Sequence, residues 1–197
     1  ASDVGMARAE SIDEDSLFAL TLSATYWSVA YPVGLFIVAD GMGGHDAGDV
    51  ASKKCVQVVV QHLMTNVLTP LVAGDALNDE SVREHIRAAI QNANQAIVEL
   101  NEETRQDMGT TITLALVIGK RAFVANVGDS RTYLMRDRLE QISVDHSLVA
   151  MLVQSGEIQP DEAYTHPQRN IVLHSLGKPD PQIDLFPADH GAIELKP

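Results

Sequence analysis

A mostly apolar run that ends in a glycine-rich loop constrains the fold of this chain more than any other feature. The run covers residues 33–39 and has the length and composition of a strand buried on both faces. It passes directly into Asp40 and the loop 41–44, in which three of four residues are glycine. A carboxylate at a strand end, followed by glycines that let backbone carbonyls approach closely, suits an ion-binding loop. An aspartate that only orders a turn is the alternative.

Two strands are predicted between residues 1 and 40, and two long helices are predicted after the glycine-rich loop. The first helix starts near Ala47 and runs to about Val67, and a connector follows over residues 69–78. Ser81 to Glu84 has the form of a capping box that opens the second helix, which ends in the charged run 102–107. Apolar residues three or four apart form one stripe of this helix: Val82, Ile86, Ile90, Ala93, Ile97 and Leu100.

From Gly109 onward the hydrophobic period changes from that of a helix to that of strands. An antiparallel meander is predicted from three β-branched or alternating segments: 110–118, 122–127 and 132–135. A short helix over 147–154 should end at Gly156, and residues 157–170 are typical of an irregular surface segment. Helices and antiparallel strands in separate blocks indicate an α+β fold, and the length favours one domain over residues 1–197.

The charge and the cysteine content exclude some classes of function. The chain has 197 residues and a formal net charge of −13, which disfavours a nucleic-acid groove. No uninterrupted apolar stretch is long enough for a bilayer, and the N-terminus lacks a signal-peptide pattern, so no membrane is expected and a cytoplasmic location is predicted. The single cysteine, Cys55, lies in an apolar helical pattern and is predicted to be a packing residue rather than a nucleophile.

Carboxylates also occur at two other predicted turns. Glu14 and Asp15 open the first strand, and Asp129 lies between two predicted strands. A solvated acidic turn is the alternative interpretation for the first pair, and a hairpin turn is the alternative for Asp129. Each position is ambiguous alone, whereas together with Asp40 they form the acidic set that a divalent cation requires.

Five motifs of this chain resemble, in order, the signature motifs of bacterial metal-dependent serine/threonine protein phosphatases of the PPM, or type 2C, family. They cover nearly the whole chain, which makes the resemblance specific. The motifs are FIVADGMGGH (36–45), MGTT (108–111), NVGDSR (126–131), QISVDHS (141–147) and HPQRN (166–170).

The resemblance implies a four-layer α-β-β-α sandwich of two antiparallel sheets flanked by helices, with a two-metal centre at one end. It implies that Asp40 bridges the metal ions, that Gly41 adds its backbone carbonyl, and that Glu14 serves the same centre with Asp15 close by. Asp129 matches an aspartate that holds a third, weaker metal. Residues 157–170 match a flap that influences substrate choice.

The implied activity is hydrolysis of phosphoserine and phosphothreonine on proteins by a metal-activated water, with a serine/threonine kinase among the expected substrates. Oxygen ligands favour Mn²⁺ or Mg²⁺ over zinc or copper. No side-chain nucleophile is needed. An inactive phosphatase-like domain that binds a partner is the alternative function, and the oligomeric state is left open.

Three departures from the family pattern bear on these expectations. The chain ends before two further aspartate motifs, so it is interpreted as C-terminally truncated, with a natural short variant as the alternative. Its sheet should then expose an unpaired edge, which favours oligomerisation or loss of order. The arginine that grips phosphate in the family is expected four residues before Glu14, but Glu10 stands there, so Arg8 either reaches the phosphate through a bulge or is an ordinary surface residue. His45 is a candidate general acid, with a backbone-bonded loop histidine as the alternative.

Overall fold

The computed structural model describes residues 13–26, 29–43 and 47–196, and its main element is a large antiparallel sheet. Five strands form its path in the order β1-β2-β4-β5-β8: β1 (Asp15–Tyr26), β2 (Val29–Met42), β4 (Ile112–Ile118), β5 (Arg121–Val127) and β8 (Asp184–Phe186). Two short strands join it, β3 (Gly109–Thr110) beside β2 and β9 (Ile193–Glu194) beside β5.

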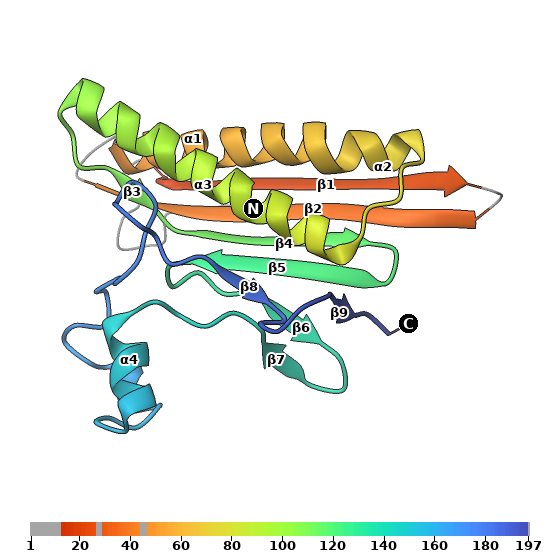
Figure 1. Ribbon diagram of the computed structural model, residues 1–197. Helices are drawn as coiled ribbons and strands as arrows, with labels where there is room; N and C mark the ends of the chain where they lie inside the picture. The colour runs from red at the N-terminus through yellow and green to blue at the C-terminus, as the bar shows by residue number, and fades with distance from the viewer. Residues whose placement is uncertain (1–12, 27–28, 44–46, 197) are drawn as a thin grey trace.

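Two helices cover one face of this sheet (Figure 1). They are α1 (Ala47–Leu63) and α3 (Asp79–Thr104), which pack against each other. Strand β2 alternates accordingly, because Leu35 and Ile37 are buried toward the helices while Phe36 and Val38 are exposed on the opposite face. The predicted stripe of α3 is confirmed, since all of its members except the half-buried Leu100 are buried.

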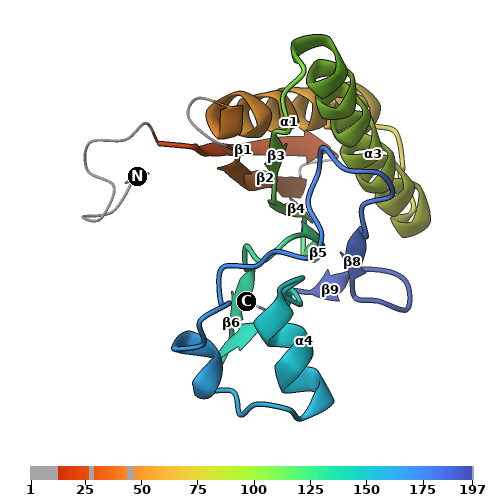
Figure 2. The ribbon, with the colours of Figure 1, turned by 90° about the vertical axis from the view of Figure 1, so that its left-hand side faces the viewer.

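A second group of elements, from β6 to η3, lies on the other side of the large sheet (Figure 2). A separate two-stranded sheet joins β6 (Tyr133–Met135) to β7 (Leu139–Gln141), and α4 (Leu148–Ser155) follows. A single 3-10 turn, η3 (Glu162–Tyr164), interrupts the irregular segment predicted over 157–170. Helices and antiparallel sheets therefore confirm the α+β class.

Three local predictions need correction. The first helix does not give way to a connector at Thr69, because it continues through a π-helical turn, η2 (Met64–Leu68), into α2 (Thr69–Ala73) and ends at Gly74. Asn78, not Ser81, caps α3: its side chain accepts a hydrogen bond from the Ser81 backbone N–H at 2.8 Å. Strand β6 does not extend the predicted meander, because it pairs with β7 in the separate sheet.

The continuous helical run 47–73 is long and apolar enough, by length and mean composition, to span a membrane. Core helices of globular proteins can have the same length and composition. In this structure α1 contacts β1, β2 and α3, and it buries the side chains of Ala51, Cys55 and Val59 completely.

Candidate functional site

Strand pairing brings the two N-terminal acidic positions beside the glycine-rich loop. In the antiparallel register of β1 and β2, Asp15 lies opposite Asp40. One residue further out, the Gly41 N–H donates to the Glu14 carbonyl oxygen at 3.1 Å. The predicted ligands Glu14, Asp15, Asp40 and Gly41 therefore share one end of the large sheet.

The first turn of α1 closes on this end, and two glycines allow it to do so. A Cβ atom added to Gly41 would lie 2.1 Å from the Gly48 carbonyl oxygen and 2.6 Å from the Glu14 carbonyl oxygen, so only glycine fits there. The Cβ position of Gly48 lies 2.9 Å from Glu14 Oε1 and 3.0 Å from the Gly41 carbonyl oxygen. A side-chain oxygen and a backbone oxygen thus converge on one small space, which is the donor chemistry that a hard divalent cation prefers.

Ser52 fixes the position of α1 relative to Glu14. Its hydroxyl donates to the Glu14 carbonyl oxygen at 2.7 Å, and its Oγ lies 2.9 Å from Ser16 Oγ. Ser52 is completely buried, so both contacts are shielded from water. The positive end of the α1 dipole is thereby held close to the Glu14 carboxylate.

Thr111 connects the Asp40 loop to the turn that carries Asp129. The Thr111 N–H donates to the Asp40 carbonyl oxygen at 2.9 Å, and the Asp40 N–H donates to Thr111 Oγ1 at 3.2 Å. The same Oγ1 lies 2.8 Å from the hydroxyl of Ser130. Because Ser130 follows Asp129, two carboxylate-bearing turns that are distant in sequence belong to one hydrogen-bonded unit.

The Asp129 turn leaves the large sheet instead of forming a hairpin within it. It leads from β5 to β6, which belong to different sheets, so the simple hairpin alternative does not hold. Gly128 has φ +106°, and a Cβ there would lie 2.5 Å from Thr111 Cγ2. Asp129 is half-buried, and burial raises the pKa of its carboxyl group above the ordinary value.

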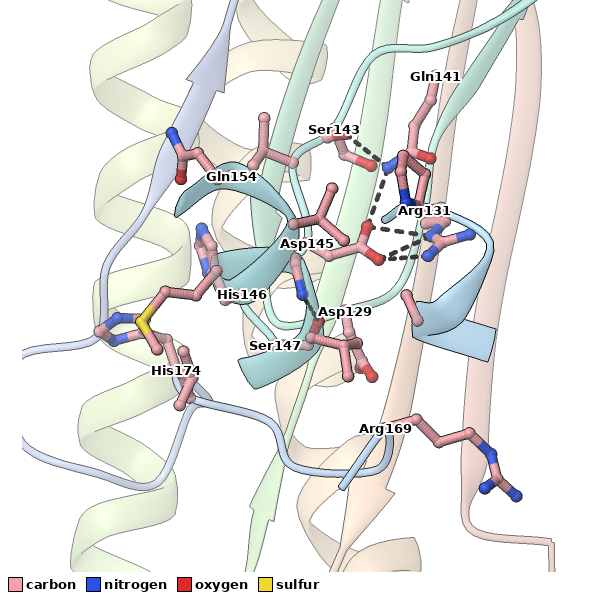
Figure 3. Close-up of a pocket in the computed structure, with 18 of the residues that line it drawn as sticks. Asp129, Arg131, Gln141, Ser143, Asp145, His146, Ser147, Gln154, Arg169 and His174 are labelled. Atoms are coloured by element: carbon pink, nitrogen blue, oxygen red, sulfur yellow. Dashed lines mark hydrogen bonds and ion pairs between the residues drawn. The ribbon is translucent and has the colours of Figure 1, made fainter. Parts of the chain in front are cut away.

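A cavity of about 1040 Å³ opens beside Asp129 (Figure 3). Its walls come from α4, from the segment 141–147 and from part of the proposed flap, including Tyr164 and Arg169. Glu14, Asp40 and Gly41 do not line it. The cavity is therefore a neighbour of the carboxylate cluster rather than its centre.

An ion pair forms one wall of this cavity. Arg131 Nε donates to both carboxylate oxygens of Asp145, at 3.0 and 2.8 Å, and Gln141 Nε2 donates to Asp145 Oδ1 at 2.9 Å. Hydrogen bonding to Asp145 raises the pKa of the Arg131 guanidinium above its ordinary value. Asp145 is thus occupied by Arg131, whereas Asp129 faces the cavity.

The described residues include every metal ligand that the sequence predicts, but not the predicted phosphate-binding arginine or the candidate general acid. Arg8 and His45 lie outside the described residues. Within ranges 13–26, 29–43 and 47–196, no three side chains of histidine, cysteine, aspartate or glutamate converge closely enough to hold a metal ion. The convergence at Gly48 joins one carboxylate to one backbone carbonyl instead, so the residues present fit a hard cation in chemistry but supply few ligands.

Three residues that support the candidate site have no individual role in the sequence predictions. Thr111 belongs to the second motif, while Gly48 and Ser52 follow the first. Their contacts join segments that are distant in the sequence, so no local pattern predicts them. Cys55 is completely buried, and burial raises the pKa of its thiol to about 12. The predicted packing role of Cys55 agrees with this environment.

Comparison with known proteins agrees with the geometry. The model of the family described as protein phosphatase 2C matches residues 3–150 of the chain. The serine/threonine phosphatase stp of Listeria monocytogenes is 42% identical over 147 residues, which are 73% of this chain and 55% of the relative. The chain thus spans about half the length of this curated relative.

Two solved structures extend the likeness to the fold. The Mycobacterium tuberculosis serine/threonine phosphatase PstP/Ppp has a TM-score of 0.73 at 35% identity, over 100% of this chain and 72% of that chain. The catalytic domain of PstP in complex with two manganese ions has a TM-score of 0.64 at 28% identity, over 92% of this chain and 73% of that one. With a family match over more than half of its length, this chain belongs to the protein phosphatase 2C family.

Proposed function

We propose that this chain carries the N-terminal part of the site of a metal-dependent phosphatase that hydrolyses phosphoserine and phosphothreonine on proteins. The observation that carries the proposal is the convergence of Glu14 Oε1 and the Gly41 carbonyl oxygen on Gly48, next to the paired positions Asp15 and Asp40. The family match and the relatives named as serine/threonine phosphatases support the same activity.

Glu14, Asp15, Asp40 and the Gly41 carbonyl would hold two ions, Mn²⁺ or Mg²⁺, and Asp129 would hold a third, weaker one. When bound, such ions supply a nucleophilic water at neutral pH and offset negative charge on the phosphate. The described residues keep the donors in place: Thr111 holds the backbone of Asp40 on both sides, and Ser52 holds the backbone of Glu14.

Other parts of the proposal concern the substrate and its surroundings. Arg8 would bind the substrate phosphate, and His45 would protonate the leaving group. Residues 157–170 would act as a flap beside the site, within a single catalytic domain. Phosphorylated proteins, among them a serine/threonine kinase, would be the substrates, in the cytoplasm. No feature of the described residues favours the alternative of an inactive binding domain.

The test measures hydrolysis of p-nitrophenyl phosphate and of a phosphothreonine peptide by the natural full-length protein in Mn²⁺. We expect Asp40→Asn to lower kcat by more than the roughly 10- to 100-fold that loss of an outer partner of a metal site costs. Asp75→Asn, which changes an exposed carboxylate in the turn after α2, is the matched control. Turnover that is absent from the parent protein, or unchanged in Asp40→Asn, would overturn the proposal.

A further inference from the structure

We propose that His146 is a positioning residue, locked in one tautomer by Asp184, that holds the turn carrying Asp129 in place. The role of Asp129 as a metal ligand rests on the proposed function above. The positioning itself rests on the hydrogen bonds of four described residues: Asn126, Gly128, His146 and Asp184.

His146 binds Gly128 through both its backbone and its side chain. The His146 N–H donates to the Gly128 carbonyl oxygen at 3.0 Å, and the Gly128 N–H donates to His146 Nδ1 at 3.2 Å. His146 therefore forms hydrogen bonds with both the backbone N–H and the backbone carbonyl of Gly128. Gly128 directly precedes Asp129, so this double contact limits how far the carboxylate can move.

Asp184 determines which ring nitrogen of His146 carries the proton. Because Nδ1 accepts from Gly128, the ring proton must lie on Nε2, and Nε2 is 2.9 Å from Asp184 Oδ2. Asp184 is itself held by β8, where it lies opposite Asn126 in the register with β5, and by a hydrogen bond from Gln182. Asp184, on β8, thus keeps the ring proton on Nε2, so that Nδ1 of His146 can accept from the Gly128 N–H.

Burial and packing make this arrangement rigid. His146 is only 6% exposed, and its ring contacts that of His174 edge-on, with centroids 5.3 Å apart (Figure 3). Asn126 adds a second restraint, because its amide donates to the Gly128 carbonyl oxygen at 2.9 Å. Both nitrogens of His146 are already engaged, so the geometry points to positioning rather than to acid–base catalysis.

The first measurement is the tautomer of His146 in the full chain, read from long-range ¹H–¹⁵N NMR correlations at neutral pH. We expect the neutral Nε2–H form. The Nδ1–H form, or a mixture of both, would overturn the proposal. This readout uses the unsubstituted chain, so it does not depend on whether a variant folds.

Two variants then separate the two ends of the imidazole. His146→Asn places an amide oxygen near the position of Nδ1, and His146→Gln places its amide near the position of Nε2. We expect hydrogen exchange of the Gly128 amide to stay slow in His146→Asn and to become at least about tenfold faster in His146→Gln. Equal exchange rates in the two variants would contradict the proposal.

Mn²⁺ binding followed by electron paramagnetic resonance links the turn to the proposed site. In His146→Gln we expect the affinity for one class of bound Mn²⁺ to fall about tenfold, as it does when an outer partner of a metal site is lost. In His146→Asn this affinity should stay close to that of the parent chain. Asp129→Asn serves as the reference. If that reference leaves Mn²⁺ binding unchanged, the proposed metal role of Asp129 fails, whereas the tautomer and the exchange rates still decide the positioning role.

Discussion

The two faces of strand β2 show how differently the two halves of this molecule are stabilised. Toward α1 and α3, Leu35 and Ile37 are 0% and 1% exposed, whereas Phe36 and Val38, on the opposite face, are 41% and 45% exposed. Residues that follow one another in the chain therefore differ almost completely in burial. The helix-covered face carries the apolar core, while the opposite face carries Asp15 and Asp40 at its end.

Beyond that open face, polar contacts replace apolar packing. Helix α4 has no buried side chain. The segment around it is held instead by the Arg131–Asp145 ion pair, by the contact of His146 with Asp184, and by a hydrogen bond from the Leu173 N–H to the His146 carbonyl oxygen at 2.7 Å. The comparison indicates that geometry at the candidate site depends on hydrogen bonds more than on the core.

The largest effect is expected where the comparison is sharpest, at the adjacent residues Ile37 and Val38. Ile37→Ala should lower the free energy of unfolding by about 3 kcal/mol, because it leaves a cavity in a closely packed core. Val38→Ala, on the open face, should cost less than about 1 kcal/mol. Urea denaturation measures both values. Similar costs would show that the outer face of β2 is also packed in solution.

The sequence predicted this core well because its signal is local. The helical stripe of α3 and the apolar run of β2 can be recognised from spacing alone, and α4 follows its cap at Ser147 and its stop at Gly156. The cap of α3 was misplaced, since Asn78 and Ser81 both carry capping side chains three residues apart. Strand period does not specify a partner, which is why β6 was assigned to the wrong sheet.

The candidate site was predictable only in part. Carboxylates near glycines and the order of five motifs indicated Glu14, Asp40 and Asp129. The approach of Gly48 to Gly41 and the bridging contacts of Thr111 arise from tertiary packing, for which no local pattern exists. The sequence therefore predicts the acidic residues of the candidate site without the neighbours that hold them in place.

The ion pair of Arg131 tests how strongly the polar half depends on a single contact. Arg131→Ala leaves the carboxylate of Asp145, 8% exposed, without its charged partner. We expect a loss of about 2 kcal/mol in the free energy of unfolding, because an unpaired charge that is nearly buried is costly. Lys53→Ala, which breaks the exposed pair with Asp49, should cost about 0.3 kcal/mol. A cost for Arg131→Ala as small as that of the control would contradict this assignment.

At Asp129 we expect a smaller effect on stability, and a gain rather than the loss expected for Arg131→Ala. Burial raises the pKa of its carboxyl group, so the folded protein binds a proton there more tightly than the unfolded chain does. This contribution to stability therefore falls as the pH rises above the ordinary value of 3.8 and through the raised pKa. In EDTA, Asp129→Asn should raise the Tm at pH 7, and the gain should disappear toward pH 3.8. A lower Tm at pH 7 would contradict the burial argument.

The smallest effect on stability is expected in the helix-covered half, at His62, a half-buried residue near the end of α1. Burial lowers the pKa of its imidazole, and His85 lowers it further. The unfolded chain thus binds the proton more tightly, so stability should be lost as the pH falls below the ordinary 6.5 and through the lowered pKa. His62→Asn keeps an acceptor for Asn92, which lies 3.2 Å from Nδ1, and removes the titrating ring. Between pH 7 and pH 5, the Tm of His62→Asn should fall less than the Tm of the parent chain. His190→Asn, which changes an exposed histidine, is the control. If His190→Asn reduces the fall in Tm more than His62→Asn does, the effect belongs to surface charge and not to His62.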